Sequence, residues 1–145
     1  MKNRFFLAAG VTTIVLFILN AVVYVFFLKD FFHNHPAVSP EFMKQLYRPD
    51  DQLIVWAVVL CSVALGCLLT TVISWSGART FTTGLRSGFI FGILMLCSVD
   101  FGLLGSTNNF TTAGAFADIT CSTIVLTISG GISAWMLGRV KTQNL

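Results

Sequence analysis

The sequence predicts an all-α integral membrane protein: a four-helix bundle with both termini in the cytoplasm and a short interfacial helix in the first outer loop. Three observations predict this class: the composition, four long apolar stretches and the placement of the basic residues. Of the 145 residues, 55% are hydrophobic and only 10% are charged, whereas charged residues make up about a quarter of a typical soluble domain. We therefore expect one transmembrane domain over residues 1–145, in a multi-pass protein of the inner (plasma) membrane.

Each apolar stretch is long enough to cross a membrane as a helix, because about 20 apolar residues span the ~30 Å hydrocarbon layer. The first two stretches contain no charged side chain, and the apolar parts of the last two contain one aspartate each. The expected spans are residues 5–28, 53–75, 85–105 and 112–137. A secretory signal has an apolar core of only about 7–15 residues, so we expect the first span to be retained.

The orientation follows from the basic residues, which alternate from one exposed segment to the next. Three of the nine lie in the 29–52 loop, and the 106–112 loop has none. The other six are Lys2, Arg4, Arg79, Arg86, Arg139 and Lys141. The side rich in Lys and Arg is normally cytoplasmic, which places both termini there. The net charge of +3 thus reflects topology, and no basic patch indicates a nucleic-acid partner.

The 29–52 loop contains the start signal of a short helix. Ser39 can act as N-cap, Pro40 suits the first helical position and Glu41 falls in the first turn. The apolar side chains that follow lie on one side of a two-turn segment. We therefore expect this helix to lie in the headgroup region of the membrane.

The histidines and cysteines do not predict a cofactor. His33 and His35 flank a single residue in the same loop, and a metal site there is an alternative to two plain interfacial side chains. The four cysteines all fall within the expected spans, and no pair has the C-x-x-C spacing of a redox or zinc site. They are Cys61, Cys67, Cys97 and Cys121. We expect neither a cofactor nor a metal.

Small residues recur at every fourth position in the third and fourth spans. They are Gly84, Gly88 and Gly92 in the third span, and Gly130 and Ala134 in the fourth. Small residues at this spacing form a flat stripe on which another helix backbone can approach closely. We expect both stripes to serve helix packing.

The third and fourth spans form a hairpin that turns near Asn109. An antiparallel hairpin of this register places Asp100 opposite Asp118, and Gly88 opposite Gly130. Both carboxylates then lie on the order of 7 Å inside the membrane end of the spans, at 1.5 Å per residue. If the glycine stripes face each other, however, the carboxylates point to opposite sides of the contact, because each is rotated by about 120° from its glycine. The sequence leaves open whether they touch.

Asp100 and Asp118 are the only acidic residues within the spans, and their surroundings differ. Asp118 lies near the N-terminus of its helix, where the helix dipole favours an anion, whereas Asp100 lies near a C-terminus. We therefore expect Asp100 to turn inward, protonated or hydrogen-bonded. Asn20 and Tyr24 of the first span complete a candidate polar site with both aspartates. The alternative is helix–helix hydrogen bonding for Asn20 and a membrane-interface position for Tyr24.

Two resemblances concern the second half of the chain. The segments FTTGLRSGFIFG, SVDFGLLGSTNNFTTAGAFADITCST and ISGGISAWMLG resemble small four-span bacterial membrane proteins of unknown function, which implies a fold and the bacterial inner membrane. SVDF around Asp100 and AFAD around Asp118 also resemble the aspartate segments of the lipoprotein signal peptidase. That resemblance implies two carboxylates that activate a water. The Asn and Asp-Arg that precede the first aspartate in that family are absent here, where residues 91–94 read FGIL.

Three functions remain open. We favour a structural or accessory membrane component whose polar residues hold helices together. The first alternative is a proton- or cation-linked small carrier that uses Asp100 and Asp118, because carboxylates inside a membrane mark functional sites. The second is an intramembrane aspartyl peptidase. The expected partners are the lipid bilayer and either a second copy of the chain or a larger membrane complex.

Overall fold

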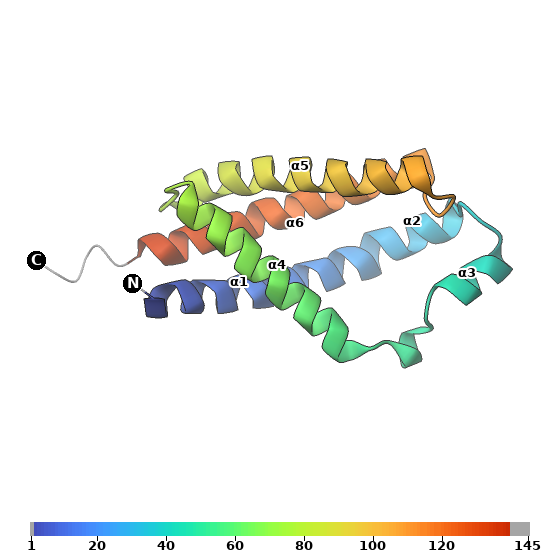
Figure 1. The fold of residues 1–145 in the computed structure, drawn as a ribbon, viewed down its shortest axis with the longest axis horizontal. Coiled ribbons are helices and arrows are strands. Elements are labelled where there is room, and N and C mark those ends of the chain that lie inside the picture. Colours follow the sequence, from blue (N-terminus) through green and yellow to red (C-terminus); the bar gives the residue numbers. More distant parts are fainter. Residues whose placement is uncertain (1, 140–145) are drawn as a thin grey trace, which may run out of the picture.

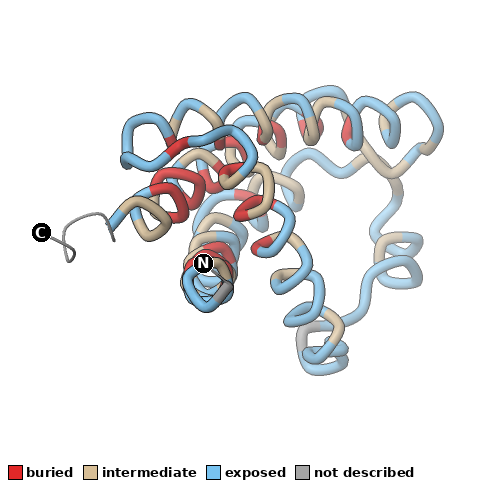
Figure 2. The backbone as a smooth tube through the Cα atoms, turned by 60° about the vertical axis from the view of Figure 1, so that its left-hand side comes forward, coloured by how far each residue is buried: buried red, intermediate tan, exposed pale blue. Residues whose placement is uncertain are grey.

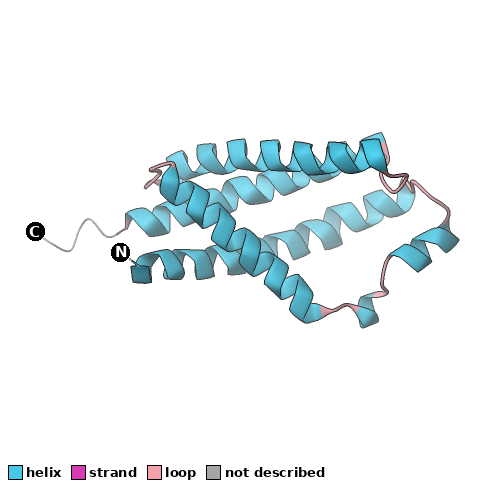
Figure 3. Cartoon of the chain, viewed as in Figure 1, coloured by secondary structure: helices cyan, strands magenta, loops and turns pink. Residues whose placement is uncertain are grey.

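The computed structural model describes residues 2–139, apart from the side chains of Lys2 and Asp50. Lys141, one of the basic residues behind the expected orientation, lies outside this range. Every regular element in the described range is a helix (Figure 3), which confirms the all-α class. The elements are α1 (Lys2–Val23), η1 (Tyr24–Leu28), α2 (Lys29–Asn34), α3 (Pro40–Leu46), η2 (Asp50–Gln52), α4 (Val55–Trp75), α5 (Phe81–Ser106) and α6 (Thr112–Gly138).

Four helices are long and apolar enough to cross a membrane: Asn3–Asn34, Val55–Trp75, Phe81–Ser106 and Thr112–Gly138. The first of them is longer than expected, because the helix continues beyond Leu28 through η1, a π-helical turn, and then α2. Charged residues at positions 29 and 30 do not stop a helix. It ends instead at His35, which precedes Pro36, where a helical backbone is sterically disfavoured.

Figure 1 shows α5 and α6 side by side and antiparallel, with α1 along another side of α6 and α4 crossing α1 obliquely. The start of α1 and the end of α6 lie together at one end of the bundle, which we call the terminal end. Helix α3 and the α5–α6 loop lie at the opposite end, which we call the α3 end. α6 is the central helix: 44% of its most apolar window is buried, against 17–22% in the other three spans.

The buried core lies in the terminal half of the bundle, where α1, α4 and α6 meet (Figure 2). Its large apolar members include Leu16, Leu69, Ile73 and Leu126. α4 crosses α1 at Gly66, where a Cβ atom would collide with the Thr13 side chain. No residue of α4 before Gly66 is buried, so the first half of this helix diverges from the rest of the bundle.

The α5–α6 hairpin is packed backbone against backbone. A Cβ atom on Gly84 would collide with the Ala134 Cβ and the Gly130 carbonyl oxygen, and one on Gly88 would lie 2.6 Å from the Leu126 carbonyl oxygen. Gly88 therefore lies opposite Gly130, in the register expected for a turn near Asn109. The two stripes of small residues face each other.

The helix ends at the α3 end of the bundle have local causes. The Ser39 hydroxyl accepts a hydrogen bond from the Phe42 amide at 3.4 Å, and Pro40 takes the first turn, so α3 begins where the sequence predicts. The Thr111 hydroxyl caps α6 by accepting from the Gly114 amide at 3.0 Å. This cap fixes the start of the helix that carries Asp118.

Candidate functional site

A pocket of about 330 Å³ lies at the α3 end of the bundle. The segments that form it are η1 and α2, the chain that leads into α3, α3 itself, the α5–α6 loop and the first turns of α6. Its lining residues are Tyr24, Leu28, Phe32, His35, Pro36, Ala37, Met43, Tyr47, Asn109, Phe110, Thr111, Gly114 and Asp118. We call it the outer pocket, after the side of the membrane expected for this end of the molecule.

Asp118 supplies the carboxylate of the outer pocket. It lies six residues after the start of α6, about 9 Å along the helix axis at 1.5 Å per residue. The side chain is half-buried, and the Ser122 hydroxyl donates a hydrogen bond to its Oδ1 at 2.8 Å. One carboxylate oxygen is thus held by the same helix, while the residue borders the cavity.

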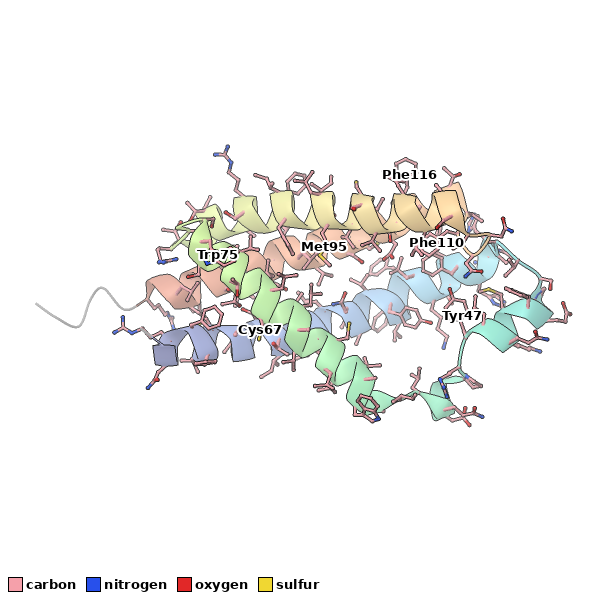
Figure 4. All side chains as sticks on the ribbon, in the orientation of Figure 1. Tyr47, Cys67, Trp75, Met95, Phe110 and Phe116 are labelled. Carbon is pink, nitrogen blue, oxygen red and sulfur yellow. The ribbon has the colours of Figure 1, made fainter. Side chains whose placement is uncertain are left out.

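Aromatic rings from four segments surround the same cavity. Phe32 of α2 and Phe110 of the α5–α6 loop meet edge to face, with ring centroids 6.2 Å apart. Tyr24 comes from η1 and Tyr47 follows α3. In Figure 4, Tyr47 and Phe110 both lie at the α3 end, although 63 residues of chain separate their positions. The outer pocket therefore exists only when α2, α3 and the hairpin loop come together.

The π-helical turn lies in the wall of this pocket. A π turn holds more residues than an α turn, so it shifts the faces of the helix that follows; such insertions are frequent at functional sites. Here Tyr24 and Leu28, at the two ends of η1, both line the cavity, and Phe32 in the next turn does so too. Since Tyr24, Leu28 and Phe32 are spaced four residues apart, this segment presents three side chains of one helix to the pocket.

Asp100 occupies a different environment. It is only 3% exposed, and its Oδ2 has no hydrogen-bond partner within the described part of the chain. Although it lies six residues from the end of α5, as Asp118 does from the start of α6, it does not line the outer pocket. The two carboxyl groups therefore do not border one shared cavity.

The structure brings together two of the four residues of the candidate polar site. Tyr24 and Asp118 line the outer pocket, while Asn20 is exposed on the surface of α1 and Asp100 is buried outside the pocket lining. Sequence reasoning missed the aromatic wall. The sequence signal for this wall is the apolar side of the short 40–46 helix, because Met43 and the following Tyr47 line the pocket.

Of the two histidines near the end of α2, His35 has structural contacts. The His35 ring stacks on Phe31 with centroids 4.4 Å apart, and its Nδ1 lies 3.0 Å from the Phe31 carbonyl oxygen. Within residues 2–139, no group of three or more His, Cys, Asp or Glu side chains is placed to hold a metal ion.

Several hydroxyl groups inside the spans are engaged in helix structure, whereas the buried hydroxyls of Thr12, Thr123 and Ser129 have no hydrogen-bond partner in the described residues. Ser62, Thr71 and Thr127 each donate to the carbonyl oxygen four residues earlier, at 2.7–3.1 Å. Ser133 of α6 donates to the Thr70 hydroxyl of α4 at 3.2 Å, inside the core. These groups satisfy their own backbone or join two helices.

No family model, no curated protein and no solved structure matches this chain. The geometry of the chain alone therefore carries the functional proposal.

Proposed function

We propose that the protein is a structural or accessory component of the inner membrane, without enzymatic activity, that associates with a second copy or with another membrane protein. A hydrogen bond between two helices supports this role most directly. The Ser133 hydroxyl of α6 donates to the Thr70 hydroxyl of α4 at 3.2 Å, inside the core. Hydrogen bonds between helices hold them together inside a membrane.

The first half of α4 is the surface that we assign to the partner. From Val55 to Leu65 no residue is buried, and this segment leads away from α1 and α6 toward η2 and α3 (Figure 1). A half-span without a neighbour in its own chain is free to pack against a helix of another chain.

Photo-cross-linking in living cells tests this role. A photoreactive amino acid at position 60, on the first half of α4, should give a discrete protein adduct. The matched control is position 94 on α5; Leu60 is 57% and Leu94 is 66% exposed, so the two sites differ in place rather than in accessibility. Adducts with lipid alone at both positions, together with a single chain in mild detergent, would refute the accessory role.

A small cation-linked carrier is the second candidate, and Asp118 on the outer pocket favours it. The peptidase hypothesis is weaker, because acid–base catalysis needs both carboxyl groups within reach of one water. Asp118 borders the outer pocket whereas Asp100 does not.

A further inference from the structure

We propose that the outer pocket binds a substituted ammonium group, of the kind carried by a lipid headgroup or by a small free amine. This ligand class goes beyond the accessory role, and it would also supply the cargo of the second candidate, the carrier. Three features of one cavity carry the inference: a single carboxylate, a wall of aromatic rings and a size that suits a small organic cation.

The carboxylate of Asp118 gives the pocket a negative charge that favours a cationic ligand. Asp118 is the only acidic residue in the lining, and none of the described residues that line the pocket is Lys or Arg. Ser122 donates to Oδ1, which leaves acceptor capacity on Oδ2, because an ionised carboxylate accepts up to about four hydrogen bonds. In a partly apolar cavity, attraction to a cation is stronger than it is in water.

The aromatic rings select the type of cation. The faces of Phe and Tyr rings attract cations, and cages of such rings recognise alkylated ammonium groups. Tyr24, Phe32, Tyr47 and Phe110 all line the cavity that Asp118 borders. A divalent metal ion would instead require several oxygen ligands, and an anion would be repelled by Asp118.

The volume and position fit both sources of ammonium. Ligand pockets generally begin at about 300 Å³, and the outer pocket has about 330 Å³, enough for a trimethylammonium or ethanolamine group with a short carbon chain. Asp118 lies about 9 Å from the start of its helix, at 1.5 Å per residue. That is near the depth at which lipid headgroups meet the hydrocarbon if α6 crosses the membrane.

The first arm of the test uses a free amine and the purified full chain in an uncharged maltoside detergent. Saturation-transfer NMR titrations compare choline with 3,3-dimethylbutan-1-ol, its neutral isostere of nearly the same shape. The parent should bind choline at least tenfold more tightly. Asp118→Asn should lose at least tenfold in choline affinity, because tenfold corresponds to about 1.4 kcal/mol, roughly the lower limit for a hydrogen bond to a charged group. The matched control Asp100→Asn should stay within about twofold of the parent. Phe110→Leu should reduce the preference for choline over the alcohol.

The second arm tests the headgroup source. The parent and both asparagine variants are extracted from bilayers of equal phosphatidylethanolamine and phosphatidylglycerol, and native mass spectrometry counts the retained lipids. The ligand is a lipid headgroup if the parent and Asp100→Asn retain phosphatidylethanolamine preferentially and Asp118→Asn does not. The ligand is a free amine if the protein is selective for choline but shows no lipid preference. Circular dichroism melting checks that each variant is folded.

Failure of the pocket proposal is distinct from failure of the accessory role. Two results would overturn the ammonium site. The first is equal binding of choline and its neutral isostere together with no lipid preference. The second is equal behaviour of the parent and Asp118→Asn in both arms. Neither result affects cross-linking at position 60, which lies on α4 away from the pocket lining. Conversely, a missing cross-link leaves choline binding unaffected.

Discussion

Close packing of α5 on α6 predicts that Gly88 cannot take a side chain. In Gly88→Ala the added Cβ would lie 2.6 Å from the Leu126 carbonyl oxygen and 3.2 Å from the Gly130 Cα, whereas ordinary contacts begin at 3.4 Å. The helices must therefore separate by about 0.8 Å at this point. Because both obstacles are backbone atoms, no rotamer change can relieve them. Overpacking of this kind costs about 1–3 kcal/mol.

Gly102 of the same helix is the matched control, because a Cβ there meets no atom within 4 Å. Gly102→Ala should stabilise the protein by about 0.5–1 kcal/mol through helix propensity. Gly88→Ala gains the same helix propensity, so unfolding by titration with sodium dodecyl sulfate in maltoside micelles should separate the two variants by the overpacking cost alone, about 1–3 kcal/mol. Equal unfolding free energies for Gly88→Ala and Gly102→Ala would show that the glycine stripes do not set the spacing of the hairpin.

Two further predictions concern the orientation and the buried carboxyl group. The orientation can be tested in a chain whose four native cysteines are replaced. A cysteine at position 76 should resist a membrane-impermeant maleimide applied from outside the cell, and a cysteine at position 108 should react, because the basic residues place the α4–α5 turn inside. The reverse labelling pattern would show that the topology is inverted. Asp100→Asn should keep the fold and change the unfolding free energy by less than about 1 kcal/mol, because the amide has nearly the same shape and the Oδ2 that it replaces makes no hydrogen bond in the described residues. A larger loss of stability would mean that Asp100 has a partner.

The hairpin is the part of the fold that the sequence predicts in detail. Glycine and alanine at every fourth position leave two flat stripes, and a short loop permits only an antiparallel arrangement, so Gly88 opposite Gly130 follows from local information. That the other two long helices can cross a membrane follows from the length of their apolar stretches alone. The start of α3 follows from Ser39 and Pro40, whose capping chemistry is local as well.

The arrangement around the outer pocket could not be predicted in this way. The rise per residue fixes the depth of Asn20, but its direction depends on how α1 rotates against α4 and α6, and it is exposed in the structure. The π turn at Tyr24–Leu28 has no composition signal that separates it from the α-helix around it. The pocket needs α2, α3 and the hairpin loop together, and no pair of these segments defines it.

The two aspartates each lie six residues from the α3 end of their helices but have different surroundings. Asp118 lies beyond the first turn of α6, to which the helix-dipole effect is confined. It borders the outer pocket, and the Ser122 hydroxyl donates a hydrogen bond to its Oδ1. Asp100 is buried, its Oδ2 has no hydrogen-bond partner in the described residues, and it does not line the pocket. A cation in the outer pocket would therefore pair with Asp118, and loss of the Asp100 carboxyl group should leave cation binding nearly unchanged.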